Sequence, residues 1–359
     1  MRGGRGPAGG QAVGARRWGL VLALVAAGGI AVAWLLARPP VEWRESRVLV
    51  ASLPYGGGVH GAGRWVGVDG RTHGPLSFAV GGGLVAVADT YHQRVLWHPL
   101  GSTAMPWTAR SLPEAMVSSI VWDAARGGWL VADSRTHVIW VVRGTGAAPA
   151  MHLATAPGTT VVWEQLMAAP HAVYVAWTAV GAGQFVTALS RYWSSGRAQL
   201  VAAWGQTQQG EWEPPVRPLI RGTATSYTVG AGGRIYLLSP TSRPAKVSLA
   251  EFTAAGQPLS HWIVHVPGVV QVSRLVGEAL GQVYLGVNLG VPNVPARIYA
   301  TAPGEPPRLE LTLPPTRELL HTYVRVGANG TLYWVVSTPQ RYEIWAQSRS
   351  LVATKGLHL

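Results

Sequence analysis

The amino-acid sequence predicts an all-β protein, a six-bladed β-propeller that follows one N-terminal transmembrane helix. Three observations lead to this fold class. A strand-like segment recurs six times, prolines recur at a constant distance before it, and twenty uncharged residues precede the first repeat. A period of about 40–50 residues built from short strands is typical of propeller blades.

Residues 1–17 are rich in glycine and arginine and show no apolar periodicity. We expect a disordered basic tail on the cytoplasmic side of a membrane. A nucleic-acid-binding tail of the RGG type is the alternative, but it would rest on two Arg-Gly steps. Nucleic acid is therefore not the partner that the sequence favours.

Residues 18–37 are expected to form a transmembrane signal anchor. Twenty residues in a helix span about 30 Å, the thickness of the hydrocarbon core. Trp18 and Trp34 lie near the two ends, where indoles favour the membrane interface. Four arginines precede the segment and three follow it closely: Arg2, Arg5, Arg16, Arg17, Arg38, Arg44 and Arg47. This bias predicts a single-pass protein of the cell membrane with its C-terminal domain outside the cytoplasm.

A cleaved signal peptide is the alternative for the same segment, although its apolar region normally has about 7–15 residues. Small residues four apart, Gly19, Ala23 and Ala27, can pair membrane helices. They also arise by chance in an alanine-rich segment, so the oligomeric state stays open. Residues 38–46 are expected to be a linker, followed by the propeller at 47–359.

Six short segments with alternating apolar residues carry the repeat. Their last residues, aligned, are Asp89, Asp133, Trp177, Ser239, Val287 and Val336. The intervals are 44, 44, 62, 48 and 49 residues. A second strand-like run follows each segment after a few polar residues, so each unit contains a β-hairpin.

Prolines give independent support for the repeat. They lie 20, 20, 21, 20 and 22 residues before the five later alignment points, at Pro113, Pro157, Pro218, Pro267 and Pro314. Proline is confined to strand ends and outer edges of sheets. Residues 47–54 resemble these proline-ended outer strands but precede the first full unit. Because a propeller must close its ring, we expect this strand to complete the sixth blade.

The first unit, GLVAVADTYHQRVLW at 83–97, resembles an NHL repeat of six-bladed β-propellers, with Asp89-Thr90 followed by Arg94-Val95. The second unit, GGWLVADSRTHVIW, is a shorter version with Asp133. The family usually has Asn where His92 stands, and the later units lack the aspartate. The resemblance implies that Asp89 and Asp133 serve the turn of the repeat and contacts to the neighbouring blade.

The composition restricts the chemistry. The chain has no cysteine, which excludes disulfides, thiolate catalysis, Cys-ligated zinc and a bacterial lipid-modified cysteine. It has only four aspartates and three asparagines, so acid–base pairs and hard-metal sites have few ligands to draw on. No G-x-S-x-G or H-E-x-x-H motif occurs. We expect no catalytic residue and no cofactor.

An enzyme is the alternative to a binding module. The wider six-bladed superfamily includes gluconolactonase- and regucalcin-like hydrolases, which hold a divalent metal in the central channel on Glu, Asn and Asp. The corresponding candidates here are Glu164 in an inner strand, Asn288 near the channel mouth, and Asp123 at the end of another inner strand. The full ligand set of that family has no match in this sequence.

Two segments break the period and are the candidates for ligand contact, because functional residues concentrate on loops over a rigid scaffold. Residues 54–75 supply His60, Arg64, Trp65, Asp69, Arg71 and His73. Residues 192–218 supply Trp212 between two glutamates. A glycine-rich connector with incidental polarity is the alternative for the first segment.

The net charge indicates the kind of partner. With four of the 29 Lys and Arg before residue 38, the rest of the chain carries 25 against all 16 Asp and Glu, or +9. Such a charge favours anionic partners. We therefore expect a binding or scaffolding module for a protein or an anionic envelope polymer. The ligand and the functional face are not determined by the sequence.

Overall fold

The structure is a computed structural model. It describes residues 41–58, 60–66, 72–102, 105–153, 160–181, 184–207, 210–211, 217–221, 224–230, 232–243, 245–266, 272–289, 291, 294–315 and 322–353. The expected tail at 1–17 and the expected anchor at 18–37 lie outside these residues. Within the described ranges, no helix has the length and hydropathy that a membrane span requires.

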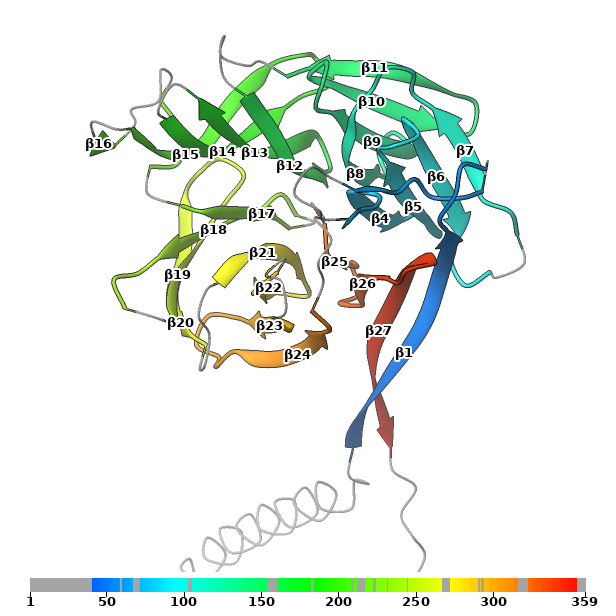
Figure 1. Ribbon diagram of the computed structural model, residues 1–359. Helices are drawn as coiled ribbons and strands as arrows, with labels where there is room; N and C mark the ends of the chain where they lie inside the picture. The colour runs from blue at the N-terminus through cyan, green and yellow to red at the C-terminus, as the bar shows by residue number, and fades with distance from the viewer. Residues whose placement is uncertain are drawn as a thin grey trace, which may run out of the picture. The chain divides into compact units, whose positions relative to one another are not determined.

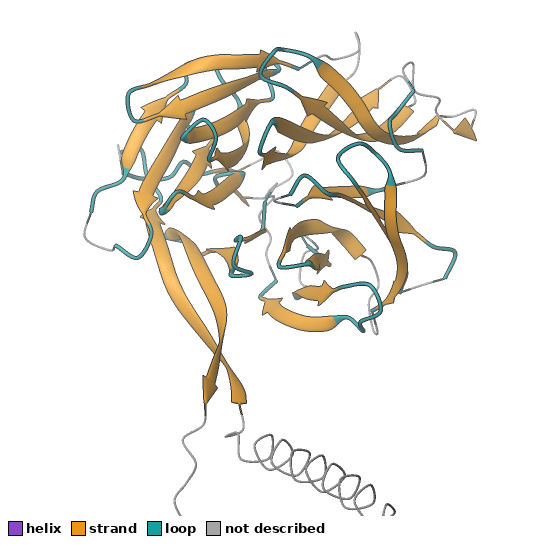
Figure 2. Ribbon diagram, turned by 180° about the vertical axis from the view of Figure 1, so that it is seen from behind, coloured by secondary structure: helices purple, strands orange, loops and turns teal. Residues whose placement is uncertain are grey.

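Residues 46–348 form one compact unit. The compact unit is a six-bladed β-propeller: six antiparallel sheets are arranged around a centre (Figure 1) and are joined by loops (Figure 2). In five of the sheets, the first strand in the chain is the innermost. The sixth sheet also includes the N-terminal strand as its outermost member, and its innermost strand is Val324–Val326. From the first blade to the sixth, the innermost strand of each blade contacts the innermost strand of the next.

The first three blades take the following strands. Blade 1 consists of β4 (Ser77–Gly81), β5 (Leu84–Asp89), β6 (Arg94–Pro99) and β7 (Thr108–Ser111). Blade 2 consists of β8 (Val117–Asp123), β9 (Gly128–Asp133), β10 (Val138–Arg143) and β11 (Gly146–His152). Blade 3 consists of β12 (Thr160–Ala169), β13 (Ala172–Gly181), β14 (Gln184–Tyr192), β15 (Ala198–Thr207) and β16 (Gly210–Glu211).

The other three blades complete the ring. Blade 4 consists of β17 (Ser226–Val229), β18 (Ile235–Pro240), β19 (Lys246–Phe252) and β20 (Pro258–His265). Blade 5 consists of β21 (Val272–Ala279), β22 (Gln282–Val287), β23 (Ala296–Thr301) and β24 (Arg308–Leu313). Blade 6 consists of β25 (Val324–Val326), β26 (Leu332–Ser337), β27 (Arg341–Ala353) and β1 (Val41–Pro54).

The last blade confirms the expected closure, because the N-terminal strand β1 pairs with the C-terminal strand β27. Across this pair, Arg341 Nε donates a hydrogen bond of 2.6 Å to Ser52 Oγ. The strand begins at Val41, so residues 41–46, which we expected to be part of a linker, are extended and belong to β1.

Blade 3 explains the long interval in the repeat. Its four main strands have nine or ten residues, whereas the corresponding strands of blade 1 have four to six. The extra residues of unit three therefore lengthen the hairpins of one blade. Part of the segment at 192–218, which breaks the period of the repeat, is the strand β15.

The core lies between the blades. Strand β9 shows how the alternation of the sequence produces it: Trp129 and Val131 pack toward blade 1, and Leu130 and Ala132 pack toward blade 3. Successive side chains of a strand point to opposite faces, so a strand buried on both sides is apolar throughout. A further cluster joins blades 5, 6 and 1 and includes Leu53 of β1. Burial of this residue helps to seal the ring.

Candidate functional site

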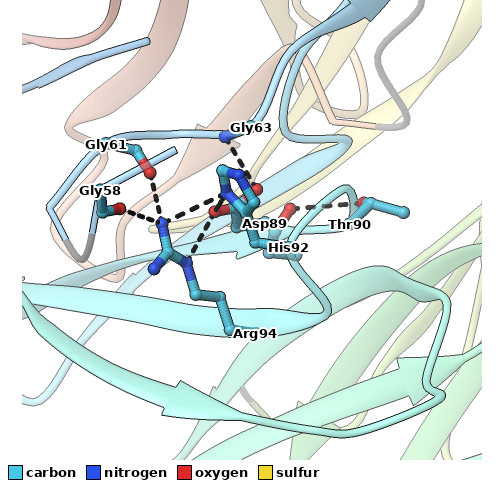
Figure 3. Close-up of polar contacts among 8 residues, drawn as sticks. Gly58, Gly61, Gly63, Asp89, Thr90, His92 and Arg94 are labelled. Carbon is cyan, nitrogen blue, oxygen red and sulfur yellow. Dashed lines mark hydrogen bonds and ion pairs between the residues drawn. The ribbon is translucent and has the colours of Figure 1, made fainter. Parts of the chain in front are cut away.

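Asp89 is the last residue of β5, and its carboxylate is fully buried. Its Oδ2 accepts a hydrogen bond of 2.9 Å from Arg94 Nε and lies 2.9 Å from His92 Nδ1. Its Oδ1 accepts a bond of 3.0 Å from the backbone N–H of Gly63 (Figure 3). Asp89 therefore connects the turn of its own hairpin to the loop that enters blade 1.

Arg94, the partner of Asp89 in the ion pair, also binds the loop that enters blade 1. Its guanidinium donates to the carbonyl oxygen of Gly58, at 3.0 Å, and to that of Gly61 (Figure 3). A Cβ atom on Gly63 would lie 2.7 Å from Asp89 Oδ1 and 2.5 Å from Tyr91 Cβ. Only glycine allows this approach, so Gly63 has a packing reason.

The second repeat aspartate uses its carboxylate in a similar way. Asp133 Oδ1 accepts bonds of 2.9 Å from the backbone N–H groups of Met116 and Arg135. Met116 immediately precedes β8, as Gly63 lies in the loop before β4. Contact to the next blade comes from Thr90, whose hydroxyl donates a bond of 2.5 Å to the carbonyl of Val117. These contacts agree with the turn role expected of the two aspartates, whereas the contact to the next blade comes from Thr90.

The loop between β1 and β4 that Asp89 and Arg94 hold, which we call the clamped loop, contributes two rings to a stack. Trp65 in β2 (Trp65–Val66) pairs with His73 in β3 (Thr72–His73), and their rings stack with centroids 4.9 Å apart. The indole of Trp65 also stacks with Tyr91, at 6.0 Å, and Tyr91 meets His92 edge to face. We call Trp65, His73, Tyr91 and His92 the aromatic patch. His73 is buried and Tyr91 is 57% exposed, so the patch extends from the protein interior to the surface.

Arg64 lies next to this patch in the chain. Its guanidinium donates a bond of 2.7 Å to the carbonyl of Pro339 and lies 4.8 Å from the ring centroid of Tyr55. The partly buried Arg64 side chain is therefore held against blade 6. The result is a cationic group whose position is set by two contacts rather than by solvent.

The structure thus brings together three of the predicted residues, Arg64, Trp65 and His73. His60 is exposed in the same loop. Asp69, Arg71 and Trp212 lie outside the described residues. Sequence reasoning missed Tyr91, which it treated as part of a polar turn; a bulky ring in a turn between two strands was the available signal.

The candidates for a channel metal lie on different blades. Asp123 ends β8, and its carboxylate closes its own turn through the N–H of Ala125, at 2.9 Å, and the guanidinium of Arg126. Asn288 follows β22 with a positive φ of 56°. Glu164 lies on the inner strand β12. Among the residues whose side chains are described, no three His, Asp or Glu groups converge as a metal site would require.

Comparison with known proteins assigns neither a family nor an activity to this chain. The sequence matches no protein-family model and no curated protein. A chain of hydrazine synthase from Kuenenia stuttgartiensis is similar in structure, with a TM-score of 0.42 and 10% sequence identity. The match covers 72% of this chain and 72% of that chain. A likeness at this level bears on neither ligand nor activity.

Proposed function

We propose that this protein is an extracytoplasmic, membrane-anchored propeller with NHL-like repeats that binds an anionic polymer of the cell envelope. The observation that carries the proposal is the clamped loop, which holds the exposed ring of Tyr91 against Trp65 beside a fixed Arg64. A pre-organised surface of this kind binds without the entropy loss of ordering a mobile loop.

The chemistry of the patch suits a polymer that has both rings and negative charge. An exposed aromatic ring offers a flat apolar face on which a sugar ring can stack, and arginine donates several hydrogen bonds to phosphate or carboxylate groups. The net charge of +9 after residue 37 adds long-range attraction to such a polymer. The same charge would attract an acidic protein, so an acidic protein immobilised at the same charge density is included in the experiment below as a separate arm.

The test measures retention of a form comprising residues 38–359 on isolated anionic wall polymer, on anionic vesicles, on neutral vesicles and on the immobilised acidic protein. We expect retention on the polymer at about 0.1 M salt and release at about 1 M, because the screening length falls from about 10 Å to about 3 Å. Tyr91→Ala, Trp65→Ala and Arg64→Gln should each weaken polymer binding.

Two control variants are matched to these. Phe185→Ala removes another exposed ring, which is 45% exposed on blade 3, and Arg243→Gln removes another exposed arginine. Both should bind as the unchanged protein does. Absence of retention at low salt, or equal loss in the controls, would contradict the proposal, and retention of an acidic protein alone would replace the polymer with a protein partner.

A further inference from the structure

The centre of the propeller contains a cavity of about 140 Å³. Residues of all six blades line it, and most of them are apolar. Its polar lining consists of Gln165, Thr228, Glu278, Arg325 and Tyr333. A cavity holds one water once it offers about 10–15 Å³, so this one has room for a small ion together with water.

Arg325 supplies the positive charge of this cavity. It lies on the innermost strand of blade 6, and its Nε donates a bond of 3.1 Å to the carbonyl of Phe78 in blade 1. One terminal nitrogen donates a bond of 2.8 Å to the carbonyl of Ile120 in blade 2. The guanidinium therefore reaches from one blade to two others across the centre, and both acceptors are neutral.

Burial lowers the pKa of Arg325 to about 10. Among the residues whose side chains are described, no carboxylate forms an ion pair with it. A charge removed from water needs a compensating charge as well as hydrogen bonds, and two carbonyl oxygens supply only the hydrogen bonds. An anion in the cavity would supply the missing charge.

Tyr333 is positioned to be a second donor. It is the direct cross-strand partner of Arg325 in the pair β25–β26, so both side chains leave the sheet on the same face. Burial raises the pKa of Tyr333, which keeps the phenol neutral and able to donate a hydrogen bond.

Glu278 is the acid in the cavity lining whose contacts are described. Its Oε1 accepts a bond of 3.0 Å from the N–H of Gly281. Its Oε2 lies close to Gly230: a Cβ atom on Gly230 would be 2.2 Å from this oxygen. The carboxylate is thus directed at the backbone of blades 4 and 5. On the wall of the cavity formed by blade 6, the polar side chains are Arg325 and Tyr333.

We propose that the central cavity binds a small oxoanion, of the size of phosphate or sulfate, between the guanidinium of Arg325 and the hydroxyl of Tyr333. Planar guanidinium groups match the oxygens of such anions through paired hydrogen bonds. The competing role for Arg325 is purely structural, as a tie between three blades. A structural tie does not respond to the anion, and this difference decides the experiment.

The full-length protein in mild detergent is titrated with inorganic phosphate and, separately, with sulfate, with chloride at equal ionic strength as the reference. Thermal unfolding and calorimetry are recorded. We expect a saturable rise in Tm, since a ligand that binds only the folded state stabilises it. Tyr333→Phe should weaken binding about tenfold through loss of one hydrogen bond to a charged group, and Arg325→Lys should weaken it further.

Arg110→Gln is the control, because Arg110 also donates a bond of 2.8 Å to a carbonyl, that of Gly144, but lies on the surface. Phosphate affinity should be unchanged in this variant. If Arg325→Gln does not fold, Tyr333→Phe and Arg325→Lys still decide the question. The proposal would be overturned if the unchanged protein showed no saturable response to phosphate. It would also be overturned if Tyr333→Phe and Arg325→Lys bound phosphate as tightly as the unchanged protein, or if Arg110→Gln bound it more weakly.

Discussion

Asp89 and Asp133 occupy the same position in successive blades, but their partners differ. Asp89 forms a buried ion pair with Arg94, which also holds the glycine loop. The bonds described for Asp133 come from backbone N–H groups and from Thr136. Removal of one member of a buried ion pair leaves the other charge uncompensated, which is more costly than losing a neutral hydrogen bond.

We therefore expect Asp89→Asn to lower the free energy of unfolding by about 3–5 kcal/mol. Asp133→Asn should lower it by only about 1–2 kcal/mol. Urea unfolding of both variants measures the difference. Equal losses in the two variants would show that the pairing with Arg94 adds nothing to the turn.

At the scale of strands, blade 4 contains a polar network that crosses three of them. Glu251 on β19 accepts bonds of 2.6 Å from Arg234 and from Ser260 on β20, and a bond of 3.3 Å from Tyr236 on β18. Burial by itself would raise the pKa of Glu251, but the hydrogen bonds from Ser260 and Arg234 and the charge of Arg234 outweigh it, and the pKa is lowered. Burial, as the largest cause, together with the charge of Glu251, raises the pKa of Tyr236 to about 12.

The network predicts how stability depends on pH. Because the folded state lowers the pKa of Glu251, its contribution to stability is present above the ordinary glutamate value of about 4.3 and is lost as the pH falls through the folded-state pKa. We expect the free energy of unfolding to fall between about pH 5 and about pH 3, and to fall less steeply in Glu251→Gln. Denaturant unfolding across this range gives both slopes, and identical slopes would contradict the assignment.

Blades 1 and 2 are in close contact where a tryptophan of one blade packs on a hairpin turn of the other. Trp122 on β8 packs against the turn between β4 and β5, where a Cβ atom on Gly81 would lie 2.3 Å from Trp122 Cβ. The turn itself has two glycines with positive φ, at 60° and 73°. This conformation matches the twist of a two-residue hairpin and suits glycine. The indole can therefore lie directly on the backbone.

At the scale of the whole molecule, stability depends on the pairing of the two ends of the propeller. Val50, Ala51 and Leu53 of β1 are buried, and two of them belong to the cluster that joins blades 5, 6 and 1. Without β1, strand β27 would become an exposed edge with unpaired backbone groups. Such edges pair with other chains and lead to aggregation.

We expect a form that begins at Val41 to be soluble, and a form that begins at Gly56 to aggregate and to melt at a lower temperature. Size-exclusion chromatography and thermal unfolding compare the two. The first form is the control, because it lacks the same upstream residues but keeps β1. Equal stability of both forms would mean that β1 does not close the ring.

The sequence by itself determined the number of blades, the hairpin in each unit and the strand that closes the ring. These features depend on local patterns: alternation of apolar residues defines a buried strand, polar turns reverse the chain, and proline marks the outer strand. Each pattern can be read within about ten residues of the chain, and the repeat multiplies the signal.

Only the tertiary structure decided which side chains meet. Asp89 binds the backbone of a residue 26 positions away, and Arg325 binds carbonyls 247 and 205 positions away. Stacking of Tyr91 on Trp65 likewise requires the loop between β1 and β4 to pack against the turn between β5 and β6. Such contacts follow from the register of the strands and from the circular arrangement of the blades. No local pattern encodes them, because the repeat specifies where a strand lies but not which distant side chain approaches its end.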